Sequence, residues 1–216
     1  MRLLLLCIDA LKKLLRGNTN GVAMLKFALS GGDEFLISEI NSCKGEFLDV
    51  GAYDGELALQ IAKLDPSRKI SSYEPVRSFY ETLAEKSDKF PDWRAYNYGL
   101  GAHTDEVEIS LSGTSSSIFA DVSQDSCTVQ IRDICEVIDA KDDLVLKLNI
   151  EGAEYEVLDK LIEVGDIGKM AALIVQFHQI DGSSKRYKNN LAKKLSRTHN
   201  CRWSYSFIWE LWERKS

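Results

Sequence analysis

The chain lacks the features that mark several large classes of protein. Its five cysteines are odd in number and form no Cys-x-x-Cys pair, so neither a disulfide framework nor a zinc site is indicated and no metal ligands are expected. Reduced thiols are typical of the cytoplasm, which is where we expect the protein. The apolar run at residues 3–8 is followed by lysines and no cleavage site. It is too short to span a bilayer, so we expect no stable membrane insertion.

The chain also lacks a net positive charge, because its 27 lysines and arginines are outnumbered by 33 acidic residues and the formal net charge is −6 over 216 residues. Such a chain does not attract nucleic acid through its total charge, and we expect no nucleic-acid partner. Residues 185–216 depart from this balance, with nine lysines and arginines against two glutamates. A solvated helix face is the first interpretation, and a basic edge that meets a phosphate-bearing acceptor or an anionic membrane is the second.

Only three prolines interrupt the chain, and each follows or precedes a periodic segment. Short apolar runs typical of buried strands, at 46–50, 69–73, 144–150 and 171–177, alternate with helical patterns at 56–64, 77–86 and 155–164. This alternation predicts an α/β fold with a mainly parallel sheet flanked by helices. We expect residues 1–45 to form a helical extension, including an amphipathic helix near residues 4–15, and residues 46–216 to form one globular domain.

Ligands bind such sheets beyond the carboxyl ends of the strands. The first strand runs into an Asp-x-Gly-x-x-x-Gly pattern, whose members are Asp49, Gly51, Tyr53, Asp54 and Gly55. The glycines allow a tight turn, and the helix that follows presents free N–H groups to a carboxylate. Asp49 offers negative charge to an ammonium group. Glu74 ends the second strand, where an acidic residue can bind both hydroxyls of a ribose.

These features favour S-adenosylmethionine as the cofactor, since it carries a carboxylate, an ammonium group and an adenosine. A nicotinamide dinucleotide is the weaker candidate. Its usual fingerprint, Gly-x-Gly-x-x-Gly, has a glycine where this chain has Tyr53, and a bulky residue there disfavours a pyrophosphate lying on the turn.

Three stretches resemble the FkbM family of methyltransferases: FLDVGAYDGELAL at 47–59, SYEP at 72–75 and LKLNIEGAEYEVL at 146–158. The third is the most specific to that family. The resemblance implies a Rossmann-like class I methyltransferase fold with a seven-stranded sheet. It also implies O-methylation, often of sugars in polysaccharides or glycosides. Asn149, counted here among the cofactor-binding residues, stands where many members have aspartate, which weakens any metal site built on that motif.

Two side chains are candidates for the chemistry at the acceptor. Glu151 and His178 follow neighbouring predicted strands, so both should lie on one rim of the sheet. A hydroxyl is a poor nucleophile unless a base accepts its proton. We favour His178 as the base and Glu151 as the residue that orients the acceptor, with reversed roles left open. Glu154 is interpreted as a helix N-terminal charge, and the loop at 113–117 as a surface loop or a cover over the acceptor.

We therefore predict a methyltransferase acting on a saccharide or glycoside hydroxyl, with fusion to or association with glycosyltransferase modules left open. The alternatives are an O-methyltransferase of another small molecule, a nucleic-acid or protein methyltransferase, and a non-catalytic binding module. Enzymes that methylate exocyclic amines commonly carry Asn/Asp-Pro-Pro-Tyr/Phe where this chain has Asn149-Ile150-Glu151-Gly152, which disfavours that class. Asp49, Gly51 and Glu74 are all present, which disfavours a module without cofactor.

Overall fold

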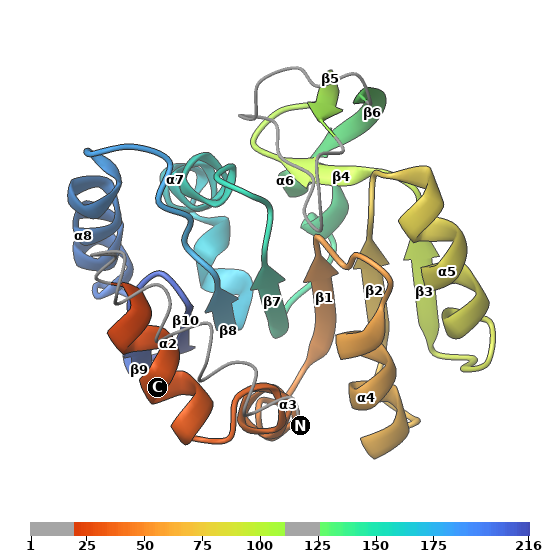
Figure 1. The fold of residues 1–216 in the computed structure, drawn as a ribbon, viewed down its shortest axis with the longest axis horizontal. Helices are drawn as coiled ribbons and strands as arrows, with labels where there is room; N and C mark the ends of the chain where they lie inside the picture. Colours follow the sequence, from red (N-terminus) through yellow and green to blue (C-terminus); the bar gives the residue numbers. More distant parts are fainter. Residues whose placement is uncertain (1–19, 111–125) are drawn as a thin grey trace.

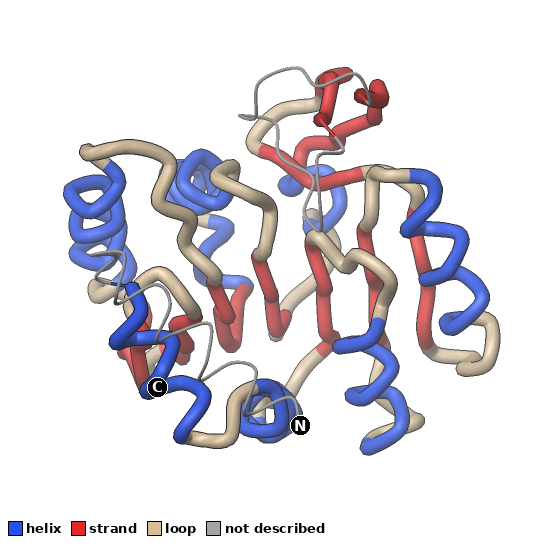
Figure 2. Tube along the Cα trace, in the orientation of Figure 1, coloured by secondary structure: helices blue, strands red, loops and turns tan. Residues whose placement is uncertain are grey.

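The computed structural model describes residues 20–110 and 126–216 and consists of a central sheet with helices on both faces (Figures 1 and 2). The sheet has seven strands in the order β3-β2-β1-β7-β8-β10-β9. Its strands are β1 (Glu46–Val50), β2 (Ile70–Tyr73), β3 (Trp93–Tyr96), β7 (Leu144–Leu148), β8 (Met170–Val175), β9 (His199–Tyr205) and β10 (Trp209–Arg214). All neighbouring pairs are parallel except those that β10 makes with β8 and β9. The predicted mainly parallel sheet of seven strands is confirmed.

Alternating side chains of the central strands bury opposite faces of the sheet, as strand geometry requires. One face packs against α2 (Asn20–Leu29), α3 (Asp33–Ser42), α4 (Glu56–Leu64) and α5 (Arg77–Ser87). The other packs against α6 (Ile134–Ile138), α7 (Glu154–Val164), the short 3-10 helix η1 (Asp166–Lys169) and α8 (Ser184–Leu195). The central strands β1, β2, β7 and β8 are buried along nearly their whole length because both faces of the sheet are covered.

A second, three-stranded sheet was not predicted. It consists of β4 (Gly99–Gly101), β6 (Ser126–Asp133) and β5 (Asp105–Ser110) in that order. Figure 1 shows these strands above the ends of β1 and β2, on the side to which the arrows of the parallel strands point. The small sheet therefore covers the carboxyl ends of the central strands, where a parallel sheet binds its ligands.

Residues 20–45 share a hydrophobic core with the sheet. Phe27, Leu36 and Ile40 are buried with β-strand side chains, and the guanidinium of Arg68 donates to the carbonyl oxygens of Ile40 and Gly45. The boundary that the sequence suggested at residue 45 stays a prediction. The amphipathic helix expected near residues 4–15 and the loop at 113–117 lie outside the described residues.

Four of the nine basic residues at 185–216 form ion pairs. Lys188 pairs with Glu210, Lys194 with Asp159, Arg202 with Glu39 and Glu213, and Arg214 with Asp143. Three of their acidic partners, Glu39, Asp143 and Asp159, come from elsewhere in the fold. In the two described stretches of chain, no helix combines the length and the apolar character needed to cross a bilayer.

Candidate functional site

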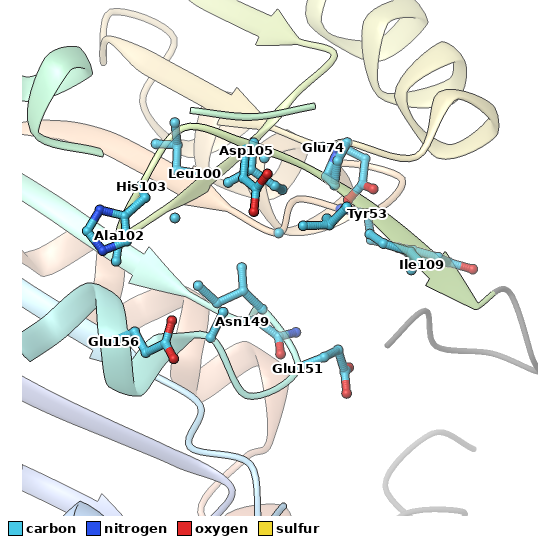
Figure 3. Close-up of a pocket in the computed structure, with 18 residues that line it drawn as sticks. Tyr53, Glu74, Leu100, Ala102, His103, Asp105, Ile109, Asn149, Glu151 and Glu156 are labelled. Atoms are coloured by element: carbon cyan, nitrogen blue, oxygen red, sulfur yellow. The ribbon is translucent and has the colours of Figure 1, made fainter. Parts of the chain in front are cut away.

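A cavity of about 420 Å³ lies between the carboxyl ends of the central strands and the small covering sheet. Figure 3 shows Tyr53 and Glu74 at one end of it, His103 and Glu156 at the other, and Asn149 between them. The floor comes from the segments after β1, β2 and β7. The cover includes apolar side chains of the small sheet, namely Leu100, Val107, Ile109 and Ile131. The cavity is therefore at the position that the sequence predicted for the cofactor.

The turn after β1 brings backbone close to backbone. Gly51 has φ +74°, and a Cβ there would lie 2.0 Å from the carbonyl oxygen of Asn149, so no other residue fits. Tyr53 adopts a left-handed conformation with φ 54°, which is uncommon for a residue with a bulky side chain. Its ring packs on that of Phe79 at a centroid distance of 4.3 Å.

Glu74 closes one end of the cavity and is held by the backbone on either side. Its Oε2 accepts from the N–H of Tyr53 at 2.8 Å, and its Oε1 accepts from the N–H of Val76 at 2.9 Å. Burial raises the pKa of Glu74, against the lowering effect of these two hydrogen bonds and of the charge on Lys147. Each carboxylate oxygen keeps a free lone pair, so the group can still accept hydrogen bonds from a ligand.

Asp49 lies beneath the cavity, away from its surface. It is 0% exposed, and the ammonium of Lys147 on β7 lies 2.8 Å from its Oδ1. The same ammonium donates to the carbonyl oxygen of Gly51 at 2.8 Å. Among the described residues no N–H donates to Asp49 in hydrogen-bond geometry, so Lys147 is its ionic partner. Lys147 thus links the buried carboxylate of Asp49 to the backbone of the glycine turn.

Asp54 and Gly55, also predicted to bind the cofactor, lie outside the residues that line the cavity. Asp54 accepts from the N–H of Glu56 at 3.1 Å and pairs with Lys86 of α5 at 3.0 Å. Asp54 therefore accepts a hydrogen bond from the first turn of α4, and its ion pair with Lys86 links the start of α4 to α5. Gly55 has φ +77° and leaves no room for a side chain beside Leu83. Gly51, Tyr53, Glu74 and Asn149 do line the cavity.

The charge of the cavity suits S-adenosylmethionine, whose sulfonium and ammonium groups are positive. Four carboxylates line it, those of Glu74, Asp105, Glu151 and Glu156, and none of its described lining residues is a lysine or arginine. Asn149 lines the same space with a buried Oδ1 that has no hydrogen-bond partner among the described residues. A buried acceptor without a partner is costly unless a ligand supplies the donor. The described residues thus fit a cationic donor of hydrogen bonds and offer no cationic side chain to a pyrophosphate.

Glu151 and His178 meet beside the cavity, as expected from neighbouring strand ends. Glu151 lines the cavity with φ 51°, and its Oε2 lies 3.5 Å from Nε2 of His178. Strain of this kind is concentrated at functional sites. The His178 side chain is 20% exposed and stands behind Glu151, outside the lining. In Figure 3 the Glu151 carboxylate points away from the middle of the cavity.

The other nitrogen of His178 faces Glu154, which sequence analysis had interpreted as a helix N-terminal charge only. Nδ1 lies 3.2 Å from Oε1 of Glu154. Burial by itself lowers the pKa of His178, but the hydrogen bond to Glu154 and the charges of Glu154 and Glu151 outweigh it, so this pKa is raised. The periodic position of Glu154 at the start of a helix gave no sign of this contact, because the contact is made across two elements.

Among the lining residues that were not predicted, three are ionisable: His103, Asp105 and Glu156. His103 and Asp105 belong to the covering sheet and the turn before it, which were not predicted to lie near the site. Among the described residues, no group of three histidine, cysteine or acidic side chains is arranged to hold a metal ion.

Three solved structures with a similar fold carry the names of methyltransferases. A protein of Clostridium thermocellum assigned as an rRNA methylase superposes with a TM-score of 0.51 at 9% identity, covering 84% of this chain and 94% of that one. Precorrin-6y C5,15-methyltransferase from Geobacter metallireducens has a TM-score of 0.47 at 11% identity, covering 86% and 88%. A SAM-dependent O-methyltransferase from Thermotoga maritima has a TM-score of 0.45 at 14% identity, covering 85% and 64%. The fold is that of the class I methyltransferases.

No curated protein sequence matches the chain. The model of the methyltransferase FkbM domain, by contrast, matches residues 49–187, which is more than half of the chain and includes every predicted site residue. The protein is thus an enzyme that uses S-adenosylmethionine, and its chain belongs to the FkbM methyltransferase family.

Proposed function

We propose that the protein transfers a methyl group to a hydroxyl of a saccharide, in a glycan or a glycoside. The observation that carries this proposal is the contact between His178 and Glu151 at the edge of the cavity. A histidine beside a carboxylate at the edge of the cavity suits methylation of an alcohol. The hydroxyl must lose its proton as its oxygen attacks, and the histidine can accept that proton.

Four residues would hold S-adenosylmethionine in this proposal. Glu74 would accept from the ribose hydroxyls, and Asn149 would use its unpartnered Oδ1 as a further acceptor. Gly51 and Tyr53 form the turn beside them, and Asp49 and Lys147 support that turn from below. When bound, the cofactor would supply an electrophilic methyl carbon to the acceptor oxygen, and its sulfur would keep the electron pair of the bond that is lost.

His178 accepts the proton of the attacking hydroxyl at Nε2, and Glu151 orients the acceptor by accepting a hydrogen bond from another of its hydroxyls. Nε2 is the nitrogen available for this step, because Nδ1 faces Glu154. His178 acts as a base only when it is neutral. Because its pKa is raised, turnover should increase with pH as His178 loses its proton.

The charge at the cavity favours a neutral acceptor rich in hydroxyls. Carboxylates accept hydrogen bonds from hydroxyl groups and repel phosphates, and the described lining has carboxylates and no lysine or arginine. This argues against phosphorylated sugars and nucleic acid, although some structural neighbours act on RNA. A cytoplasmic site of action and association with glycosyltransferase modules would fit such an acceptor and remain part of the proposal.

The first test is to incubate the protein with methyl-labelled S-adenosylmethionine and a source-cell extract, then to separate glycan, nucleic acid, protein and small molecules. We expect label in the glycan or glycoside fraction. A Glu74→Ala sample is the control, in which that label should vanish. Label in RNA, DNA or protein would exclude the saccharide proposal and leave the family and the cofactor unaffected.

The proposed base has a test of its own. We expect His178→Ala to keep its affinity for S-adenosylhomocysteine, because His178 does not line the cavity, and to lose turnover by roughly 10²–10⁴-fold, the usual contribution of a general base. Calorimetry measures the first quantity and initial rates with the labelled acceptor measure the second. Wild-type turnover in His178→Ala would remove His178 from the mechanism.

A further inference from the structure

The side chain of Glu154 is buried in a way that the charge of a helix N-terminus does not require. It is the first residue of α7 and is 0% exposed. Its Oε2 accepts from the N–H of Gly152 at 2.8 Å. Its Oε1 accepts from the backbone N–H of His178 at 2.6 Å and lies 3.2 Å from the Nδ1 atom of that residue. One carboxylate thus binds the backbone and the ring of the same histidine.

A buried carboxylate is costly unless its oxygens are paired. Favourable interaction with the helix dipole does not account for the burial, because the exposed Glu156 in the same first turn provides it without desolvation. Glu154 differs from Glu156 in its contacts with the N–H of Gly152 and with His178. A second hydrogen bond, from the hydroxyl of Tyr155 to the carbonyl oxygen of His178 at 2.7 Å, holds the same segment from α7.

The geometry determines which ring nitrogen carries the proton in the neutral histidine. An ionised carboxylate only accepts hydrogen bonds, and the contact of Nδ1 with the fully buried Glu154 is shorter than that of Nε2 with the partly exposed Glu151, so Nδ1 is assigned as the donor. Nε2 is then left without a proton and faces Glu151 at 3.5 Å. We propose that Glu154 is a positioning residue, which holds His178 in the tautomer protonated on Nδ1 and leaves Nε2 free to accept a proton from the substrate. The role of Nε2 rests on the proposed function, whereas the tautomer does not.

The groups that face His178 come from each element around it. Glu151 approaches from the loop after β7, and Glu154 and Tyr155 approach from α7. From α8, Lys188 lies over the ring of Phe177, the residue before His178, and forms an ion pair with Glu210. The two carboxylates are the charges that act directly on the imidazole.

Long-range proton–nitrogen NMR of the imidazole rings tests the tautomer without any acceptor. The chain has only three histidines, and His178→Asn assigns the signal. We expect wild-type His178 to be protonated on Nδ1 above its pKa. In Glu154→Gln, which keeps the size and one acceptor oxygen, that pKa should fall by roughly one unit or more. Glu163→Gln is the matched control, because it removes the same charge from an exposed position on α7 and should leave the titration unchanged.

Two results would overturn the inference: a proton on Nε2 in the wild-type protein, or the same pKa in Glu154→Gln and Glu163→Gln. The first measurement needs no variant of Glu154, so it stands even if that variant folds poorly. Once an acceptor that the enzyme methylates is known, Glu154→Gln should lower kcat more than tenfold and leave KM for S-adenosylmethionine unchanged. The pH profile of kcat should move to lower pH. Failure to methylate saccharide would leave the NMR result intact, which separates this inference from the proposed function.

Discussion

At the scale of single residues, Gly51 is the position where the turn after β1 (Figure 1) permits no side chain. We expect Gly51→Ala to lower the free energy of unfolding by roughly 1–3 kcal/mol through backbone strain alone, with a further loss from the 2.0 Å contact to Asn149. Gly165→Ala is the matched control, because Gly165 has φ +86° but nothing within 4 Å of an added Cβ. Urea unfolding of both variants measures the difference. Equal destabilisation would show that the close approach to Asn149 is unimportant.

The residues of the candidate site were predictable where they follow from strand ends and glycine turns. Gly51, Glu74, Glu151 and His178 lie near the cavity because each closes or follows a strand whose pattern is plain in the sequence. The identity of each ion-pair partner was not predictable, because the partner comes from another element. Lys147 joins Asp49 across β1 and β7, and Lys86 joins Asp54 from α5.

At the scale of elements, the ion pair between Asp49 and Lys147 links two central strands. The two residues are directly opposite in the parallel register of β1 and β7, and both are buried. We expect Lys147→Met to lower the free energy of unfolding by about 3–5 kcal/mol, because it leaves a buried charge without a partner. The double variant Asp49→Asn/Lys147→Met should recover much of that loss.

Denaturant unfolding of the two single variants and the double variant completes this cycle. Losses that simply add would contradict a direct interaction, since independent sites are additive. Recovery in the double variant would also show that the pair is required for charge balance more than for packing.

The strands of the central sheet were predictable from periodicity, and β4 of the covering sheet was not. The buried strands β7 and β8 are nearly continuous apolar runs, which the sequence shows directly. β4, by contrast, has three residues, two of them glycine, and carries no strand pattern. Its existence depends on pairing with β6, and the side chain of Ile131 on β6 fills the space beside both glycines. Pairing between segments that are distant in the sequence depends on tertiary structure, so the local pattern of residues does not predict it.

At the scale of the whole molecule, the cavity lies between two sheets whose strands come from different parts of the chain. The turns after β1, β2 and β7 form its floor, and β4, β5 and β6 form its cover. A ligand held between the two sheets binds the folded protein and not the unfolded chain. Binding should therefore stabilise the entire fold by mass action.

S-adenosylmethionine at about 100 times its Kd should add about 2.7 kcal/mol to the free energy of unfolding. For a domain of this size, each kcal/mol raises Tm by about 2–4 °C, so we expect a rise of roughly 5–10 °C by calorimetry. Glu74→Ala should show no such rise at the same concentration, since its proposed ribose contact is lost. Glu81→Ala is the control, because Glu81 is exposed and pairs only with Arg77 of the same helix among the contacts described. An equal rise in Glu74→Ala would mean that the cofactor binds elsewhere, and the floor of the cavity would then be assigned to the acceptor.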